Sequence, residues 1–125
     1  MVLADTNIII DYLKKPDDRM TDIFEQEDIA ICGIVEAELI HGALSEKDID
    51  NILEAISCFE KRAFSGNWIR LGRMLYKLRK SGVTVPFNDV MIAQIAIEYG
   101  ISVLTNDHHF KLIKNIIPEL QLYEI

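Results

Sequence analysis

The stretch V-L-A-D-T-N-I-I-I-D-Y-L, residues 2–13, decides how this chain folds. Its apolar residues 2–4 predict a short buried strand that ends at Asp5. Thr6 and Asn7 are residue types that begin helices, and the residues after them predict a helix to the end of the stretch. A strand followed at once by a helix begins an α/β unit, so Asp5 is expected at the carboxyl end of a strand.

The same alternation of short apolar runs and helical patterns continues along the chain. Further strands are expected at residues 29–32, 103–105 and 120–123, with an ambiguous segment at 58–63. Helices are expected at residues 20–26, from 33 onward, and at 45–57, 68–82, 89–100 and 108–114. This order favours an α/β fold in which helices cover both faces of a parallel sheet. In such folds ligands bind beyond the carboxyl ends of the strands.

Size and composition restrict the class of protein. The chain has 125 residues, of which 50% are hydrophobic and 26% charged, so one globular domain over residues 1–125 is expected. No apolar run reaches the ~20 residues of a membrane span, and the first residues lack the pattern of a signal peptide, so a cytoplasmic location is expected. Cys32 and Cys58 lack the spacing of a zinc site and are expected to be buried thiols in a reducing compartment.

Four acidic residues are predicted to meet at one edge of the sheet. Asp5 and Asp107 follow strands, and Asp89 begins a helix. Glu38 is expected on an inward or half-buried face of its helix, whereas Glu36 should face solvent. Each Asp alone is explained as a helix cap, but capping does not explain why three such residues and an inward Glu converge.

Convergence of carboxylates requires cations or shared protons. Two carboxylates about 4 Å apart repel each other by about 4 kcal/mol at an effective dielectric constant of about 20. The histidines, His41, His108 and His109, are not spaced as a zinc ligand set, and an all-oxygen pocket suits Mg²⁺ or Mn²⁺. Because these ions neutralise phosphate oxygens and activate water, the pocket predicts phosphodiester hydrolysis. Such chemistry needs no titrating histidine, so His108 and His109 are less favoured as general acids.

Four stretches together resemble a known family. They are residues 2–13 above, I-V-E-A-E-L-I-H-G-A (34–43), F-N-D-V-M-I-A-Q-I-A (87–96) and V-L-T-N-D-H-H-F (103–110). Their order and the chain length are similar to those of PIN-domain ribonucleases, in particular the VapC-type toxins of toxin–antitoxin pairs. The resemblance implies an α/β/α sandwich with a central, mainly parallel sheet. It also implies a Mg²⁺- or Mn²⁺-dependent endoribonuclease with RNA as substrate, an antitoxin whose tail covers the active site, and a homodimer.

The resemblance implies roles for single residues as well. Four acids are similar to the metal-binding and catalytic residues of the family: Asp5, Glu38, Asp89 and Asp107. Thr105 resembles a hydroxyl residue that assists near the metal, and Thr6 and Asn7 resemble groups that hold the first loop. Whether Glu38 completes a second metal site or takes the proton from water stays open, as does the choice between one and two ions.

The bases of the chain suggest a contact with the substrate. The net charge is −7, yet residues 61–80 hold seven basic residues and no acidic one. Helical spacing places four of them on one face: Arg70, Arg73, Lys77 and Lys80. The opposite face carries an apolar stripe expected in the core: Trp68, Leu71, Leu75 and Leu78. The basic face is a hypothetical RNA contact; the alternatives are a solvated surface paired with the acidic first half of the chain and a contact with an acidic antitoxin tail.

Other classes of function fit less well. A phosphatase of the D-x-D type would have Asp where Asn7 stands, and a receiver domain would have paired acids early in the chain. Two alternatives to a toxin stay open: a non-catalytic PIN-like module that binds RNA or protein, and a housekeeping PIN nuclease without an antitoxin.

Overall fold

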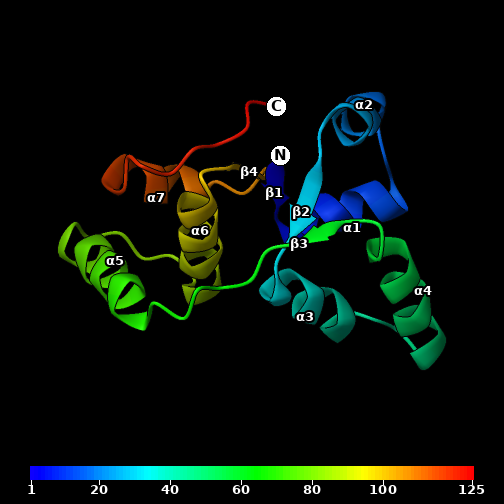
Figure 1. The fold of residues 1–125 in the computed structure, drawn as a ribbon, viewed down its shortest axis with the longest axis horizontal. Coiled ribbons are helices and arrows are strands. Elements are labelled where there is room, and N and C mark those ends of the chain that lie inside the picture. Colours follow the sequence, from blue (N-terminus) through cyan, green and yellow to red (C-terminus); the bar gives the residue numbers. More distant parts are fainter.

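The short apolar runs form a parallel sheet at the centre of the molecule. The computed structural model describes residues 1–125, and Figure 1 shows the arrangement of its elements. The sheet has the strand order β3 (Glu60–Lys61), β2 (Ile29–Ile31), β1 (Val2–Ala4) and β4 (Ser102–Leu104). All neighbouring strands are parallel. β1 and β2 are buried along their whole length, as expected for strands that are covered on both faces.

Helices cover both faces of this sheet. They are α1 (Thr6–Lys14), α2 (Asp18–Gln26), α3 (Gly33–His41), α4 (Glu46–Ile56), α5 (Trp68–Lys80), α6 (Phe87–Tyr99) and α7 (His109–Ile116). Figure 1 shows α5, α6 and α7 on one side of the strands and α1 to α4 on the other. The predicted α/β/α sandwich with a central parallel sheet is therefore confirmed. None of these helices has the length and apolar character needed to cross a membrane.

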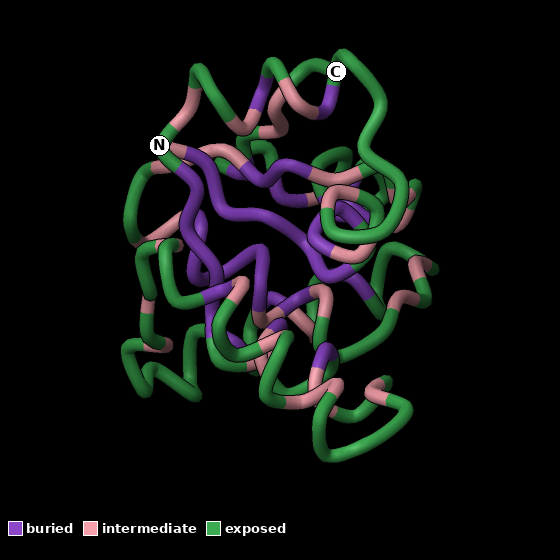
Figure 2. The backbone as a smooth tube through the Cα atoms, turned by 90° about the vertical axis from the view of Figure 1, so that its right-hand side faces the viewer, coloured by how far each residue is buried: buried purple, intermediate pink, exposed green.

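α6 is the most completely buried helix. Val90 and residues 92–96 are buried around its whole circumference, because β4, α5 and α7 all pack against it. Figure 2 shows the buried backbone running through the middle of the molecule, with exposed backbone around it. Gly100 ends α6 with a φ of 66°, a left-handed conformation that glycine adopts without a steric penalty. Asp89 lies in the first turn of this helix, at the end opposite Gly100.

The inward stripe of α5 differs from the prediction at Trp68 and at Leu75, which is half-buried. It consists of Leu71, Met74 and Leu78, whereas Trp68 is 59% exposed and not part of the core. Trp68 is the first residue of α5 and lies one turn before the first buried position. Its ring packs edge-on against Phe64, with the ring centroids 4.7 Å apart. Trp68 fits the helical period of the stripe, but its ring lies on the surface and not against the core.

Two smaller predictions are also wrong. Cys32 is buried at the N-cap of α3, but Cys58 is exposed because α4 ends before it, at Ile56. The segment predicted as a last strand forms only an isolated parallel bridge, between Val103 and Leu122.

Candidate active site

Asp5 lies at the carboxyl end of β1 and is held from two sides. Asp5 is only 5% exposed. It caps α1, because its Oδ1 accepts a hydrogen bond from the Thr6 backbone N–H at 2.7 Å. Its Oδ2 accepts a hydrogen bond from the Thr105 hydroxyl at 2.9 Å. The parallel register of Ala4 with Leu104 brings Asp5 and Thr105 together at the same edge of the sheet.

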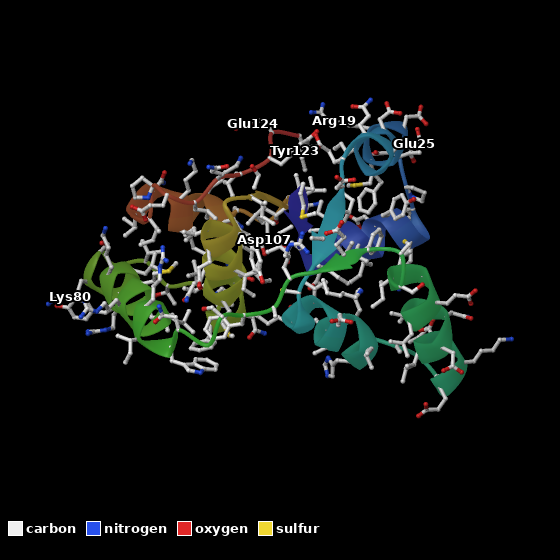
Figure 3. The ribbon with its side chains drawn as sticks, viewed as in Figure 1. Arg19, Glu25, Lys80, Asp107, Tyr123 and Glu124 are labelled. Atoms are coloured by element: carbon white, nitrogen blue, oxygen red, sulfur yellow. The ribbon has the colours of Figure 1, made fainter.

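Asp107 lies beside Asp5, in the turn between β4 and α7. Its backbone N–H donates to the Thr105 hydroxyl at 3.0 Å, and its Oδ1 accepts the backbone N–H of His109 at 3.0 Å. Asp107 is half-buried. Figure 3 shows Asp107 at the centre of the molecule, between α6 and the strands.

Asp89 comes from the first turn of α6 and faces the same place. Its side chain is 14% exposed. Its Oδ2 lies 3.1 Å from Nδ1 of His109, and the same nitrogen lies 3.2 Å from Oδ1 of Asp107. His109 therefore bridges two of the predicted acids, an interaction that the sequence analysis did not anticipate. One signal in the sequence could have indicated this bridge: His109 follows Asp107 by two residues, at the start of a helix.

Glu38 joins the cluster from α3, but its burial was predicted wrongly. Glu38 is exposed, and its Oε1 accepts a hydrogen bond from the Thr6 hydroxyl at 3.1 Å. Glu36 is half-buried and lies 3.8 Å from the ammonium of Lys61, away from the cluster. The inward positions of α3 are Val35 and Leu39, so the Glu next to this stripe lies at its edge, facing the start of α1.

The acids are joined by one continuous set of hydrogen bonds. It runs from Glu38 through Thr6 to Asp5, then through Thr105 to Asp107, and through His109 to Asp89. Each acid comes from a different part of the chain, so only the folded protein assembles the set. Of the groups that the resemblance placed near the first loop, Thr6 belongs to this set, whereas Asn7 is exposed on α1 and takes no part in it.

The bases of α5 form a separate surface. Arg70, Arg73, Lys77 and Lys80 are all exposed. Figure 3 shows Lys80 at the far end of α5 from Asp107. The acids and the basic face are therefore two distinct features of the molecule.

Burial and mutual repulsion make full ionisation of the acids unfavourable. The pKa of Asp89 is raised from 3.8 to about 6, first by burial and then by the negative charges of Asp5 and Asp107, while His109 opposes the rise. Burial is also the main cause that raises the pKa of Asp5.

The donor set fits a hard divalent cation. Asp5 and Asp89 lose solvent on folding and are repelled by their neighbours, and a cation among the carboxylates would offset both costs. All four acids offer oxygen donors, which Mg²⁺ and Mn²⁺ prefer. Asp107, His108 and His109 offer ligand atoms within 4.8 Å of one another, but the His108 side chain is 76% exposed. The carboxylates are therefore the groups that could hold such an ion.

The fold and the site define a class: an α/β protein with a carboxylate cluster at the carboxyl edge of a parallel sheet. Residues 2–116 match the PIN domain family, and the chain belongs to that family. No curated protein sequence matches it.

Solved structures of toxin–antitoxin complexes contain chains of the same fold. A chain in VapBC from Salmonella typhimurium bound to DNA is 27% identical, with a TM-score of 0.84 and 98% of each chain covered. A chain in VapBC2 from Rickettsia felis, bound to a promoter DNA fragment, is 28% identical, with a TM-score of 0.81 and 98% of each chain covered. A chain in VapBC-1 from nontypeable Haemophilus influenzae is 26% identical, with a TM-score of 0.80 and 99% of this chain and 98% of that chain covered.

The raised pKa of Asp89 predicts how stability depends on pH in metal-free protein. The folded state binds the Asp89 proton more tightly than the unfolded state, because the pKa is about 6 when folded against the ordinary value of 3.8. The free energy of unfolding should therefore fall as pH rises from about 4 to about 6, by roughly 3 kcal/mol from this group. Asp89→Asn removes the titration and should flatten this part of the profile.

Denaturant unfolding between about pH 4 and pH 7, with a chelator present, measures the effect. Asp50→Asn, on the exposed face of α4, is the control and should keep the wild-type profile. An Asp89→Asn profile as steep as that of wild type would contradict the assigned environment of Asp89.

Proposed function

We propose that this protein is a divalent-metal-dependent endoribonuclease and the toxin of a toxin–antitoxin pair. The observation that carries the proposal is the convergence of Asp5, Glu38, Asp89 and Asp107 through one set of hydrogen bonds. Membership of the PIN domain family and similarity to chains of VapBC complexes support it. A non-catalytic binding module would have no need for this costly gathering of acids.

Asp5 and Asp107 are the residues that would hold the cation. They are adjacent at the sheet edge, where the Thr105 hydroxyl donates to the Asp5 carboxylate and accepts from the Asp107 backbone N–H. Asp89 completes the pocket from α6. A bound Mg²⁺ or Mn²⁺ would supply positive charge against the phosphate oxygens and would make a nearby water more acidic.

Glu38 is placed to take the proton from the attacking water. It is the exposed member of the four, and the Thr6 hydroxyl fixes one of its oxygens. In the proposed reaction the water oxygen forms a bond to phosphorus as the bond from phosphorus to the leaving ribose oxygen breaks. The water proton goes to the Glu38 carboxylate, and the leaving oxygen takes a proton from solvent.

Asp5→Asn is the variant that tests the nuclease proposal. We expect cleavage of cellular RNA in Mg²⁺ or Mn²⁺ to fall by at least about a hundredfold, since loss of a direct ligand should exceed the roughly 10–100-fold effect of its supporting groups. The fold should persist, because Asn keeps one oxygen for the Thr6 N–H. The matched control is Glu36→Gln, which changes an acid outside the cluster and should keep activity.

A chelator should stop cleavage by the wild type and by Glu36→Gln alike. Full activity of purified Asp5→Asn protein, or cleavage that persists in the chelator, would refute the proposed function.

The exposed bases of α5 are proposed as an RNA-binding face. They form one face of the helix opposite its core stripe, and like-charged neighbours favour a polyanion as partner. Since the chain as a whole is acidic, with a net charge of −7, this face is where phosphate repulsion is least.

Charge reversal at Arg73 tests this RNA-binding face. Arg73→Glu should weaken RNA binding, and the slope of log affinity against log salt should become shallower by about 0.7 for each single-strand phosphate that the variant no longer neutralises. Binding is measured without divalent metal so that RNA is not cut. Lys47→Glu, an exposed change on α4, is the control. The RNA role is wrong if Arg73→Glu matches the control in both affinity and salt dependence.

The antitoxin partner is proposed for a groove beside the acids. The groove has a volume of about 290 Å³ and lies between α1, α3 and α4. Its apolar lining includes Leu13, Leu39 and Ile52, and Glu38 also lines it. A segment bound there would adjoin the acid cluster, which fits an antitoxin whose tail covers the active site.

Ile52→Asp should weaken binding of the protein encoded by the adjacent reading frame, measured by calorimetry with the purified pair. The neighbouring change Leu53→Asp, at an exposed residue outside the groove, should leave affinity unchanged. Equal affinity of wild type and Ile52→Asp would place the antitoxin elsewhere. The homodimer stays a prediction; the exposed apolar surface at Trp68 and Ile69 is available for it.

A further inference from the structure

The His109 side chain lies between two of the acids, Asp89 of α6 and Asp107 before α7. His109 is the first residue of α7, and its side chain is 29% exposed. Its Nδ1 lies 3.1 Å from Oδ2 of Asp89 and 3.2 Å from Oδ1 of Asp107. Ionised carboxylates only accept hydrogen bonds, so the nitrogen between them must carry the hydrogen and donate it.

The position of the Asp89 carboxylate depends on its hydrogen bond with His109. Asp5 accepts hydrogen bonds from the Thr6 backbone and the Thr105 hydroxyl. The Asp89 carboxylate has His109 as its hydrogen-bond partner. The charges of Asp5 and Asp107 both repel Asp89. Without the His109 donor, this repulsion would favour rotamers that turn the Asp89 carboxylate away from Asp5 and Asp107.

We propose that His109 is a positioning residue, whose Nδ1 donates to Asp89 and lies against Asp107, and which thereby holds the two carboxylates at the separation that a divalent cation requires. The inference rests on the proposed function, because it assumes that these acids bind a cation. His109 does not contact the reacting atoms in this account. It acts through the two carboxylates, in the way that groups behind metal ligands orient them.

The adjacent histidine provides an internal comparison. Nδ1 of His108 lies 3.6 Å from Oδ1 of Asp107, which is beyond hydrogen-bond distance, and its side chain is 76% exposed. The two rings are neighbours, with centroids 4.5 Å apart, but His109 is 29% exposed and His108 is not placed against Asp89. Only one of the pair is placed to position Asp89.

Amide substitutions separate the two nitrogens of the ring. In Asn the side-chain NH₂ is attached to Cγ, as Nδ1 is in His, whereas in Gln it lies one atom further out, close to the position of Nε2. His109→Asn should therefore keep the donor to Asp89 beside Asp107, and His109→Gln should lose it.

The test is calorimetric titration of the metal-stripped full chain with Mn²⁺, which needs no RNA and no cleavage. We expect His109→Gln and His109→Ala to bind Mn²⁺ roughly 10–100-fold more weakly than wild type. His109→Asn should stay close to wild type, and His108→Asn should be unchanged. Thermal unfolding of each metal-free variant checks that the fold is retained.

Each other outcome overturns the inference. If His109→Gln and His109→Ala bind Mn²⁺ as wild type does, His109 does not position the acids, although the nuclease proposal survives. If His109→Gln keeps affinity and His109→Asn loses it, Nε2 is itself the important atom and the positioning role is wrong. If wild type binds no Mn²⁺, the proposed function fails and this inference fails with it.

Discussion

Repulsion among carboxylates that the fold brings to one edge of the sheet is the constraint on which the rest of the site depends. Asp5 is almost wholly buried, and Asp89 has a pKa raised to about 6 by burial and by its acidic neighbours. Hydrogen-bond donors partly offset this repulsion: the Thr6 backbone, the Thr105 hydroxyl and His109. These donors hold the acids together but leave their negative charge in place. A site of this kind favours a cation and, through it, a phosphate group.

Much of this arrangement could be predicted from the sequence because it depends on local patterns. Three-residue apolar runs fix β1 and β2, and an acid directly after a strand must lie at the carboxyl edge of a parallel sheet. That reasoning placed Asp5 and Asp107 at the same edge, and the β1–β4 register of the structure brings Asp5 beside Thr105, to which Asp107 also bonds. The burial of α6 on all sides was harder to predict. Its sequence has no amphipathic stripe, so the pattern does not indicate which face of the helix is buried.

The features that sequence reasoning missed all depend on where one element ends against another. Trp68 fits the period of α5, but the helix begins there, and its ring lies on the surface against Phe64 rather than in the core. Glu38 was expected on an inward or half-buried face, yet it lies exposed at the edge of the α3 stripe, where it bonds to Thr6 at the start of α1. The bridge made by His109 needs α6 and α7 to meet at their first turns, which no local pattern records.

The central claim is that these acids form one cation site. Crystals of the protein soaked in Mn²⁺ and measured at the manganese absorption edge test it most directly. We predict an anomalous peak bonded to carboxylate oxygens of Asp5 and Asp107, with Asp89 facing the same ion. A peak at any other place on the molecule, or no peak in a lattice that leaves this edge open to solvent, would contradict the account.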